Sequence, residues 1–231
     1  DKMNGIAECI KTKRSNLIMD FIKKEIDEYA SNHTQKEPEL LYELNRETNM
    51  NVLRPRMLSG HFQGRVLSML SKMIRPKDVL EIGTYTGYSA LCMAEGLAEG
   101  GHIVTIDKNE ELEDLVKSYV ERSEYADSIK CVIGDAMEII PGLKREFDLV
   151  FIDADKGNYI NYYNLTFDKV RSGGYFIFDN VLWSGKVLEE IDEKDLDTQV
   201  LVELNDLIHQ DDRVEEVLLP IRDGLLIARK K

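Results

Sequence analysis

A glycine-containing turn is the first stretch of this chain that could bind a ligand. The apolar run 79–82 leads into Gly83 and Gly87, a helical pattern follows, and a second apolar run ends in Asp107. Glycines at a strand-to-helix turn let the backbone approach a ligand closely, and an acid ending the next strand can accept hydrogen bonds from ribose hydroxyls. The spacing Gly-x-x-x-Gly lacks the pyrophosphate-binding pattern Gly-x-Gly-x-x-Gly. It therefore favours a nucleoside without phosphates over NAD or FAD.

Two other positions fit such a nucleoside. Glu81 lies just before the turn and could face the ammonium group of an amino-acid-bearing ligand. The turn formed by Gly134, Asp135 and Ala136 follows the third apolar run, where an adenine could lie. With the glycine turn, these positions indicate a nucleoside site at the carboxyl ends of parallel strands.

Hard oxygen ligands follow two later apolar runs. Asp153 ends one of them, and Asp179 and Asn180 end another. Because strand ends on one edge of a parallel sheet meet in the same crevice, we expect these side chains to lie close together. Two carboxylates and an amide oxygen suit an octahedral cation such as Mg²⁺, which Mn²⁺ or Ca²⁺ could replace.

The elements that position these residues alternate between short apolar runs and helical stretches. We expect strands near residues 78–83, 102–107, 129–133, 147–153 and 174–179. We expect helices near residues 87–98, 109–124, 135–144 and 158–171, with Asn109 and Asp135 as N-caps. Continuous apolar strands between helices indicate a parallel sheet with helices on both faces.

The N-terminal part of the chain has a helical pattern throughout. Apolar spacing predicts a helix over about 15–30 and a second helix whose first turn contains Pro38. Ser59 could cap a third helix, which Pro76 would prevent from continuing. These helices predict an N-terminal cap over residues 1–58.

The C-terminal part completes the predicted sheet. A helix near 195–210 precedes apolar runs at 214–219 and 225–228, which flank a hairpin signal at 222–224. We therefore expect a single α/β domain over 1–231, in which residues 59–231 form the core. Its seven-stranded, mostly parallel sheet would finish with an antiparallel strand.

Composition limits the classes of function. The 231 residues carry a formal net charge of −13, which opposes contact with nucleic acid phosphates and with anionic membranes. Three cysteines, Cys9, Cys92 and Cys131, have neither metal nor redox spacing, and no apolar run is long enough to cross a membrane. The N-terminus also lacks an apolar stretch long enough for a signal peptide, so we expect a cytoplasmic protein.

Three motifs together resemble the cation-dependent O-methyltransferases, a class I family whose methyl donor is S-adenosylmethionine (SAM). They are Glu-Ile-Gly-Thr-Tyr-Thr-Gly-Tyr-Ser over 81–89, Asp-Ala-Asp-Lys-Gly-Asn-Tyr over 153–159 and Asp-Asn-Val-Leu-Trp over 179–183. The family includes caffeoyl-CoA O-methyltransferases, catechol O-methyltransferases and many bacterial relatives, and the similarity covers residues from about 35 to 231. The resemblance implies a Rossmann-like SAM-methyltransferase fold.

The family's residue roles can be carried over to the matching positions. By resemblance, the metal ligands are Asp153, Asp179 and Asn180, and Lys156 is the general base. Trp183 would flank the acceptor ring. The residues expected around SAM are Ser59, Glu81, Gly83, Thr84, Ser89, Asp107, Asp135, Ala136 and Asp155.

The reaction that the resemblance implies is methyl transfer from SAM to a hydroxyl of a catechol-type small molecule. A vicinal diol on an aromatic ring is the natural bidentate ligand for a cation, which lowers the hydroxyl pKa and fixes the geometry. Ser184 and the segment 60–64 depart from the family pattern. These departures leave the identity of the acceptor open.

The sequence leaves two alternative functions open, a tRNA methyltransferase and a non-catalytic SAM-binding protein. O-methylation of a hydroxylated tRNA base is weakened by the acidic charge but kept open by basic residues at Lys11, Lys13, Arg14, Lys23 and Lys24. A non-catalytic SAM-binding protein is opposed by the intact set of proposed site residues. The apolar N-terminal helices and the resemblance together predict a homodimer.

Overall fold

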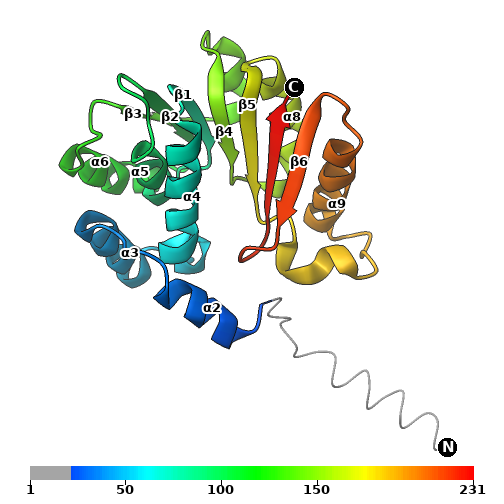
Figure 1. The fold of residues 1–231 in the computed structure, drawn as a ribbon, viewed down its shortest axis with the longest axis horizontal. Helices are drawn as coiled ribbons and strands as arrows, with labels where there is room; N and C mark the ends of the chain where they lie inside the picture. The colour runs from blue at the N-terminus through cyan, green and yellow to red at the C-terminus, as the bar shows by residue number, and fades with distance from the viewer. Residues whose placement is uncertain (1–21) are drawn as a thin grey trace, which may run out of the picture.

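A single mixed β-sheet organises the computed structural model, which describes residues 22–231 (Figure 1). Its strands are β1 (Asp78–Ile82), β2 (His102–Asp107), β3 (Ile129–Ile133), β4 (Phe147–Ile152), β5 (Val170–Asp179), β6 (Val214–Leu219) and β7 (Leu225–Lys230). Their order across the sheet is β3-β2-β1-β4-β5-β7-β6. β7 lies antiparallel between β5 and β6, whereas β1 to β5 pair in parallel. The predicted seven-stranded, mostly parallel sheet is confirmed.

Helices cover both faces of this sheet. The α-helices are α2 (Lys24–Asn32), α3 (Glu39–Asn51), α4 (Gly60–Ile74), α5 (Tyr88–Ala94), α6 (Glu113–Arg122), α7 (Ala136–Ile139), α8 (Tyr159–Phe167) and α9 (Leu196–His209). The 3-10 helices are η1 (Pro55–Met57), η2 (Glu110–Leu112), η3 (Ile140–Gly142), η4 (Lys156–Asn158) and η5 (Trp183–Leu188). No helix within residues 22–231 is long and apolar enough to cross a membrane.

The core consists of two clusters, one on each face of the sheet. Successive strand residues point to opposite faces, so Leu80 joins one cluster and Val79 joins the other. Helices α7, α8 and α9 pack in the first cluster, and α3, α4, α5 and α6 pack in the second. Both faces of the central strands are therefore buried, which explains their continuous apolar runs.

The strand order reverses between β1 and β4, and this switch point creates a crevice at their carboxyl ends. Backbone hydrogen bonds hold the two segments that leave these strands. Gly83 N donates to Ile106 O at 2.9 Å, and Asp153 N donates to Ile82 O at 2.9 Å. The glycine turn and the first predicted metal ligand thus lie side by side.

Several predicted boundaries differ from the structure. The predicted helix over 135–144 is divided into α7 and η3, because Pro141 lacks the N–H that a continuous α-helix needs. The fifth strand begins at Val170 rather than 174, and it includes Gly173 and Gly174 beside an irregular register between Phe147 and Leu149. The helix predicted over 15–30 lies partly outside the described residues.

The N-cap predictions have mixed outcomes. Asn109 Oδ1 accepts from Glu111 N at 3.1 Å, and Asp135 Oδ1 accepts from Met137 N at 2.8 Å, so both caps are confirmed. The prediction for Ser59 is wrong: α4 begins at Gly60, but the Ser59 side chain makes no capping hydrogen bond to any described residue. Its backbone is already helical (φ −54°, ψ −39°), whereas a capping serine needs an extended backbone.

Candidate active site

The glycine turn after β1 is packed tightly against the segment after β4. Gly83 has φ +102°, and a Cβ atom built on it would overlap the carbonyl oxygen of Asp153. Only glycine fits this backbone and this approach without a shift. Gly87, with φ +83°, ends the turn immediately before α5. The predicted turn is therefore present, and glycine is required at Gly83 both by its backbone conformation and by its packing.

Asp107 at the end of β2 stabilises the same turn. Its Oδ2 accepts from Tyr85 N at 2.8 Å, and its Oδ1 accepts from Asn109 N at 2.9 Å. These backbone donors fix the orientation of the half-buried carboxylate. Each oxygen keeps a further lone pair that can accept a hydrogen bond from a ligand hydroxyl.

Glu81 is fully buried beneath the turn. Thr105 Oγ1 donates to its Oε2 at 2.5 Å and lies 2.5 Å from Thr84 Oγ1, while Oε1 makes no hydrogen bond to any residue in 22–231. Burial raises the pKa of Glu81 to about 8, although nearby Ser89 and Thr105 act in the opposite direction. A buried oxygen without a donor is suited to accept from a ligand ammonium group.

The predicted metal ligands surround Lys156. Its Nζ donates to Asn180 Oδ1 at 2.8 Å and lies 3.2 Å from Asp153 Oδ1. Asp179 is buried, and burial together with the charge of Asp153 raises its pKa above the usual range. Asn180 has φ +60°, a left-handed backbone conformation that asparagine tolerates better than most residues. The predicted convergence of oxygen ligands is thus present, with an ammonium group among them.

The donor set fits a hard cation. Among residues 22–231, no group of three His, Cys, Asp or Glu side chains could hold a metal ion. The predicted set is of another kind, since its third member is the amide oxygen of Asn180. Two carboxylates and an amide oxygen, completed by water, are a suitable ligand set for Mg²⁺.

Two aromatic rings flank the lysine. Lys156 Nζ lies 4.7 Å from the centre of the Tyr159 ring and 5.7 Å from that of the Trp183 ring, and it donates to Tyr159 Oη at 2.5 Å. Trp183 and Ser184 both have positive φ, and Ser184 N donates to Asp223 Oδ1 at 2.5 Å. The acceptor-side residues predicted from the third motif therefore lie beside the lysine.

The remaining predicted residues lie at the same edge of the sheet. Asp135 caps α7 with its exposed side chain, and Ala136 is buried at the start of that helix. Asp155 is exposed and accepts from Tyr162 Oη at 2.7 Å and from Asn158 Nδ2 at 2.5 Å. Its side chain thus contacts α8, so a role beside a nucleoside stays a prediction.

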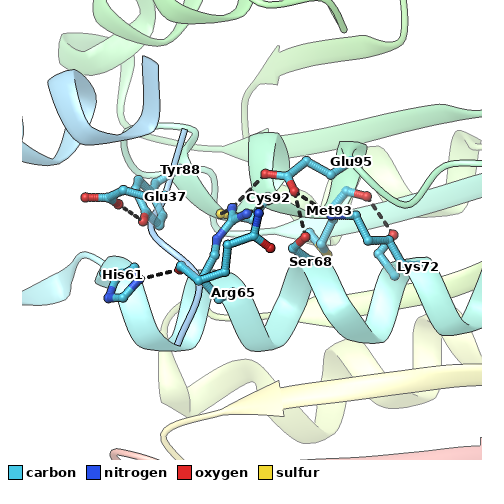
Figure 2. Close-up of polar contacts among 11 residues, drawn as sticks. Glu37, His61, Arg65, Ser68, Lys72, Tyr88, Cys92, Met93 and Glu95 are labelled. Carbon is cyan, nitrogen blue, oxygen red and sulfur yellow. Dashed lines mark hydrogen bonds and ion pairs between the residues drawn. The ribbon is translucent and has the colours of Figure 1, made fainter. Parts of the chain in front are cut away.

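A polar network fixes α5, the helix that follows the glycine turn, against α4 (Figure 2). The Arg65 guanidinium donates to both oxygens of Glu95, at 2.9 and 2.6 Å, and Ser68 and Lys72 donate to the same carboxylate. Tyr88 Oη donates to Glu37 at the N-terminal side of α3. This network could not be predicted from the sequence, because no local motif joins its members.

Comparison with known proteins identifies the family. A family model described as O-methyltransferase matches residues 30–231. This chain belongs to that O-methyltransferase family. A caffeoyl-CoA O-methyltransferase of Petroselinum crispum is 34% identical over 206 residues, which cover 84% of this chain and 85% of that protein. Caffeoyl-CoA O-methyltransferase 2 of Eucalyptus globulus is 35% identical over 207 residues, covering 84% and 83%.

Solved O-methyltransferase structures share the fold. An O-methyltransferase from Bacillus cereus in complex with SAH has a TM-score of 0.82 and 29% identity, and the match covers 90% of this chain and 97% of that one. The O-methyltransferase TomG from Streptomyces achromogenes, in complex with SAM, has a TM-score of 0.82 and 25% identity, covering 91% and 99%. The predicted Rossmann-like fold and the predicted activity, SAM-dependent O-methylation, are both confirmed. The non-catalytic alternative is therefore set aside.

Proposed function

We propose that this O-methyltransferase requires a divalent cation and methylates a hydroxyl of a catechol-type small molecule. The observation that carries the proposal is the convergence of Asp153 and Asn180 on the Nζ atom of Lys156, with the buried carboxylate of Asp179 beside them. This group lies next to Gly83, at the switch point where open α/β sheets bind ligands. The relatives named as caffeoyl-CoA O-methyltransferases support a phenolic acceptor.

The roles proposed for the SAM-side residues follow from their hydrogen-bonding capacity. Glu81 Oε1 would accept from the ammonium group of SAM, and Asp107 would accept from its ribose hydroxyls. Gly83, Thr84 and Ser89 would line the methionine end. Ser59, Asp135, Ala136 and Asp155 would complete the pocket, as the family resemblance implies.

On the acceptor side, Asp153, Asp179 and Asn180 would hold the cation. When bound, SAM supplies the methyl group, and the cation supplies positive charge that lowers the hydroxyl pKa from the value of about 10 typical of a phenol. Lys156 Nζ would accept the proton from that hydroxyl, and Trp183 would flank the acceptor ring. Alignment of the two reactants in one crevice can lower the barrier by about 7–11 kcal/mol, so positioning is the main contribution of the protein.

The tRNA alternative receives no specific support. Of its five basic residues, Lys11, Lys13 and Arg14 lie outside the described residues. Lys24 pairs with Glu28 at 3.5 Å on the surface of α2. The predicted homodimer stays a prediction that light scattering would test.

Methyl transfer from tritium-labelled SAM tests the proposal. The wild type should label caffeate in the presence of Mg²⁺ and lose this activity in excess EDTA. Asp153→Asn should lose activity that added Mg²⁺ cannot restore, because a charged ligand is removed. Asp127→Asn, which makes the same change at an exposed site, is the matched control. Full wild-type activity in EDTA would contradict the cation requirement, and labelling of bulk tRNA instead of caffeate would favour the alternative acceptor.

A further inference from the structure

We infer that Gln63, oriented by Arg222, is a positioning residue that holds the carboxylate of Asp179 ready for a divalent cation. This inference rests on the proposed cation requirement. Gln63 lies in the first turn of α4 and is only 1% exposed. Its Nε2 donates to Asp179 Oδ2 at 2.5 Å, across 116 residues of sequence.

The carboxylate of Asp179 is fixed at both oxygens. Gln63 donates to Oδ2, and the backbone N–H of Asn180 donates to Oδ1 at 2.7 Å. Each oxygen keeps a lone pair for a cation, since a carboxylate oxygen has two acceptor sites. The two donors therefore set the plane of the carboxylate while its capacity to bind a metal is retained.

Arg222 determines which end of the Gln63 amide faces Asp179. Its Nη1 donates to Gln63 Oε1 at 3.3 Å. A guanidinium group can only donate, so the amide oxygen must face Arg222 and the amide NH₂ must face the carboxylate. With the amide reversed, an oxygen would face Asp179 and a second donor would face Arg222, and both hydrogen bonds would be lost.

Arg222 is kept in an unfavourable backbone conformation. Its φ is +49°, in the left-handed region that residues other than glycine adopt only under strain. The same Nη1 also lies within hydrogen-bonding distance of Leu58 O, at 3.1 Å, and of Ser59 O, so its two hydrogens are shared among three acceptors. The side chain thus ties the β6–β7 turn to the start of α4. A glycine at this position would relieve the backbone while removing these contacts.

The turn that carries Arg222 also holds the segment after Asn180. Leu182 N donates to Asp223 O at 2.9 Å, and Val181 N donates to Gly224 O at 3.3 Å. The hairpin turn therefore contacts both α4, through Gln63, and the loop that follows the metal ligands. This double contact is what allows one side chain of α4 to fix the orientation of a carboxylate at the end of β5.

Mn²⁺ binding by the full chain, measured by calorimetry without SAM or acceptor, tests the inference. Gln63→Met keeps the length of the side chain but removes the donor, and the Kd should rise about 10- to 100-fold, as for other residues that orient metal ligands. Arg222→Gly should also raise the Kd, while its melting temperature should stay close to that of the wild type, because relief of the strained φ of +49° offsets the contacts that are lost. Gln210→Met, on the exposed end of α9, is the matched control and should leave the Kd unchanged.

The outcomes separate the inference from the proposed function. Mn²⁺ affinities of Gln63→Met and Arg222→Gly within twofold of wild type would overturn the positioning role and leave the cation requirement intact. Absence of Mn²⁺ binding by the wild type would overturn both. Should Gln63→Met fail to fold, Arg222→Gly decides alone, because a weaker affinity without a loss of thermal stability is not expected of a purely structural residue.

Discussion

Replacement of Glu95 by alanine should strongly destabilise the fold behind the glycine turn. The Arg65 and Glu95 side chains are 8% and 11% exposed, so the pair is nearly removed from water. Two donors of Arg65, together with Ser68 and Lys72, satisfy the Glu95 carboxylate (Figure 2). Glu95→Ala would leave the Arg65 guanidinium buried without its partner, and breaking a buried pair in this way costs about 3–5 kcal/mol.

The cost can be expressed as a melting temperature. For a domain of this length, each kcal/mol lost from the free energy of unfolding lowers the melting temperature by about 2–4 °C. Glu95→Ala should therefore lower the melting temperature by roughly 6–20 °C. Urea unfolding gives the free energy of unfolding directly. Because α5 begins just after the glycine turn, affinity for SAH should fall as well if the network positions that turn.

A second ion pair provides the control. Arg122 and Glu43 also pair, but their side chains are 47% and 44% exposed, so Glu43→Ala should lower the melting temperature far less than Glu95→Ala does. The double replacement Arg65→Met with Glu95→Leu should recover most of the stability, since a buried pair can often be replaced by apolar side chains. The reasoning is refuted if Glu95→Ala is no more destabilising than Glu43→Ala.

Two further changes test the cofactor side. Gly83→Ala should abolish SAH binding in calorimetry, because the new Cβ overlaps the Asp153 carbonyl and φ +102° adds about 1–3 kcal/mol of strain; Gly142→Ala, whose Cβ would meet open space, should bind normally. Equal SAH affinity in the two variants would contradict the packing argument. Burial raises the pKa of Glu81 from 4.5 to about 8, so the folded protein keeps a proton that the unfolded chain has lost, and stability without SAM falls as pH rises through this window. Glu81→Gln should remove this loss of stability. The melting temperature of the variant minus that of the wild type should therefore increase from about pH 5 to about pH 8. A difference that is constant over this range would show that Glu81 does not titrate as described.

Much of the fold could be predicted because its signals are local. Apolar runs placed β1 and β4 within one residue of their ends, since both faces of these strands are buried. Asn109 and Asp135 were recognisable as caps because a cap bonds to a backbone N–H only two residues away. Serine is also a residue type that often caps helices, but the backbone of Ser59 is helical, which residue type alone does not reveal.

For the site, the sequence predicted which residues come together but not how their side chains are arranged. Asp153, Asp179 and Asn180 end parallel strands, and topology brings such ends together whatever the loops do. The ammonium of Lys156 among their oxygens depends on η4, a short 3-10 turn, and on the left-handed backbone of Asn180. Neither feature has a clear signal in the sequence.

Gln63 and Arg222 show why residue positions alone do not define the site. Their hydrogen bonds span 116 and 159 residues, so no spacing rule connects them to Asp179 or to each other. Arg222 also lies at a φ where turn chemistry favours glycine, so a local reading treats it only as part of a hairpin. An arginine at a position where the backbone favours glycine must be stabilised by contacts of its side chain. Here the side chain of Arg222 contacts Gln63, which in turn donates to a carboxylate of the candidate metal site. The strand ends therefore determine which oxygens are present, whereas these distant donors determine how Asp179 presents its oxygens to a cation.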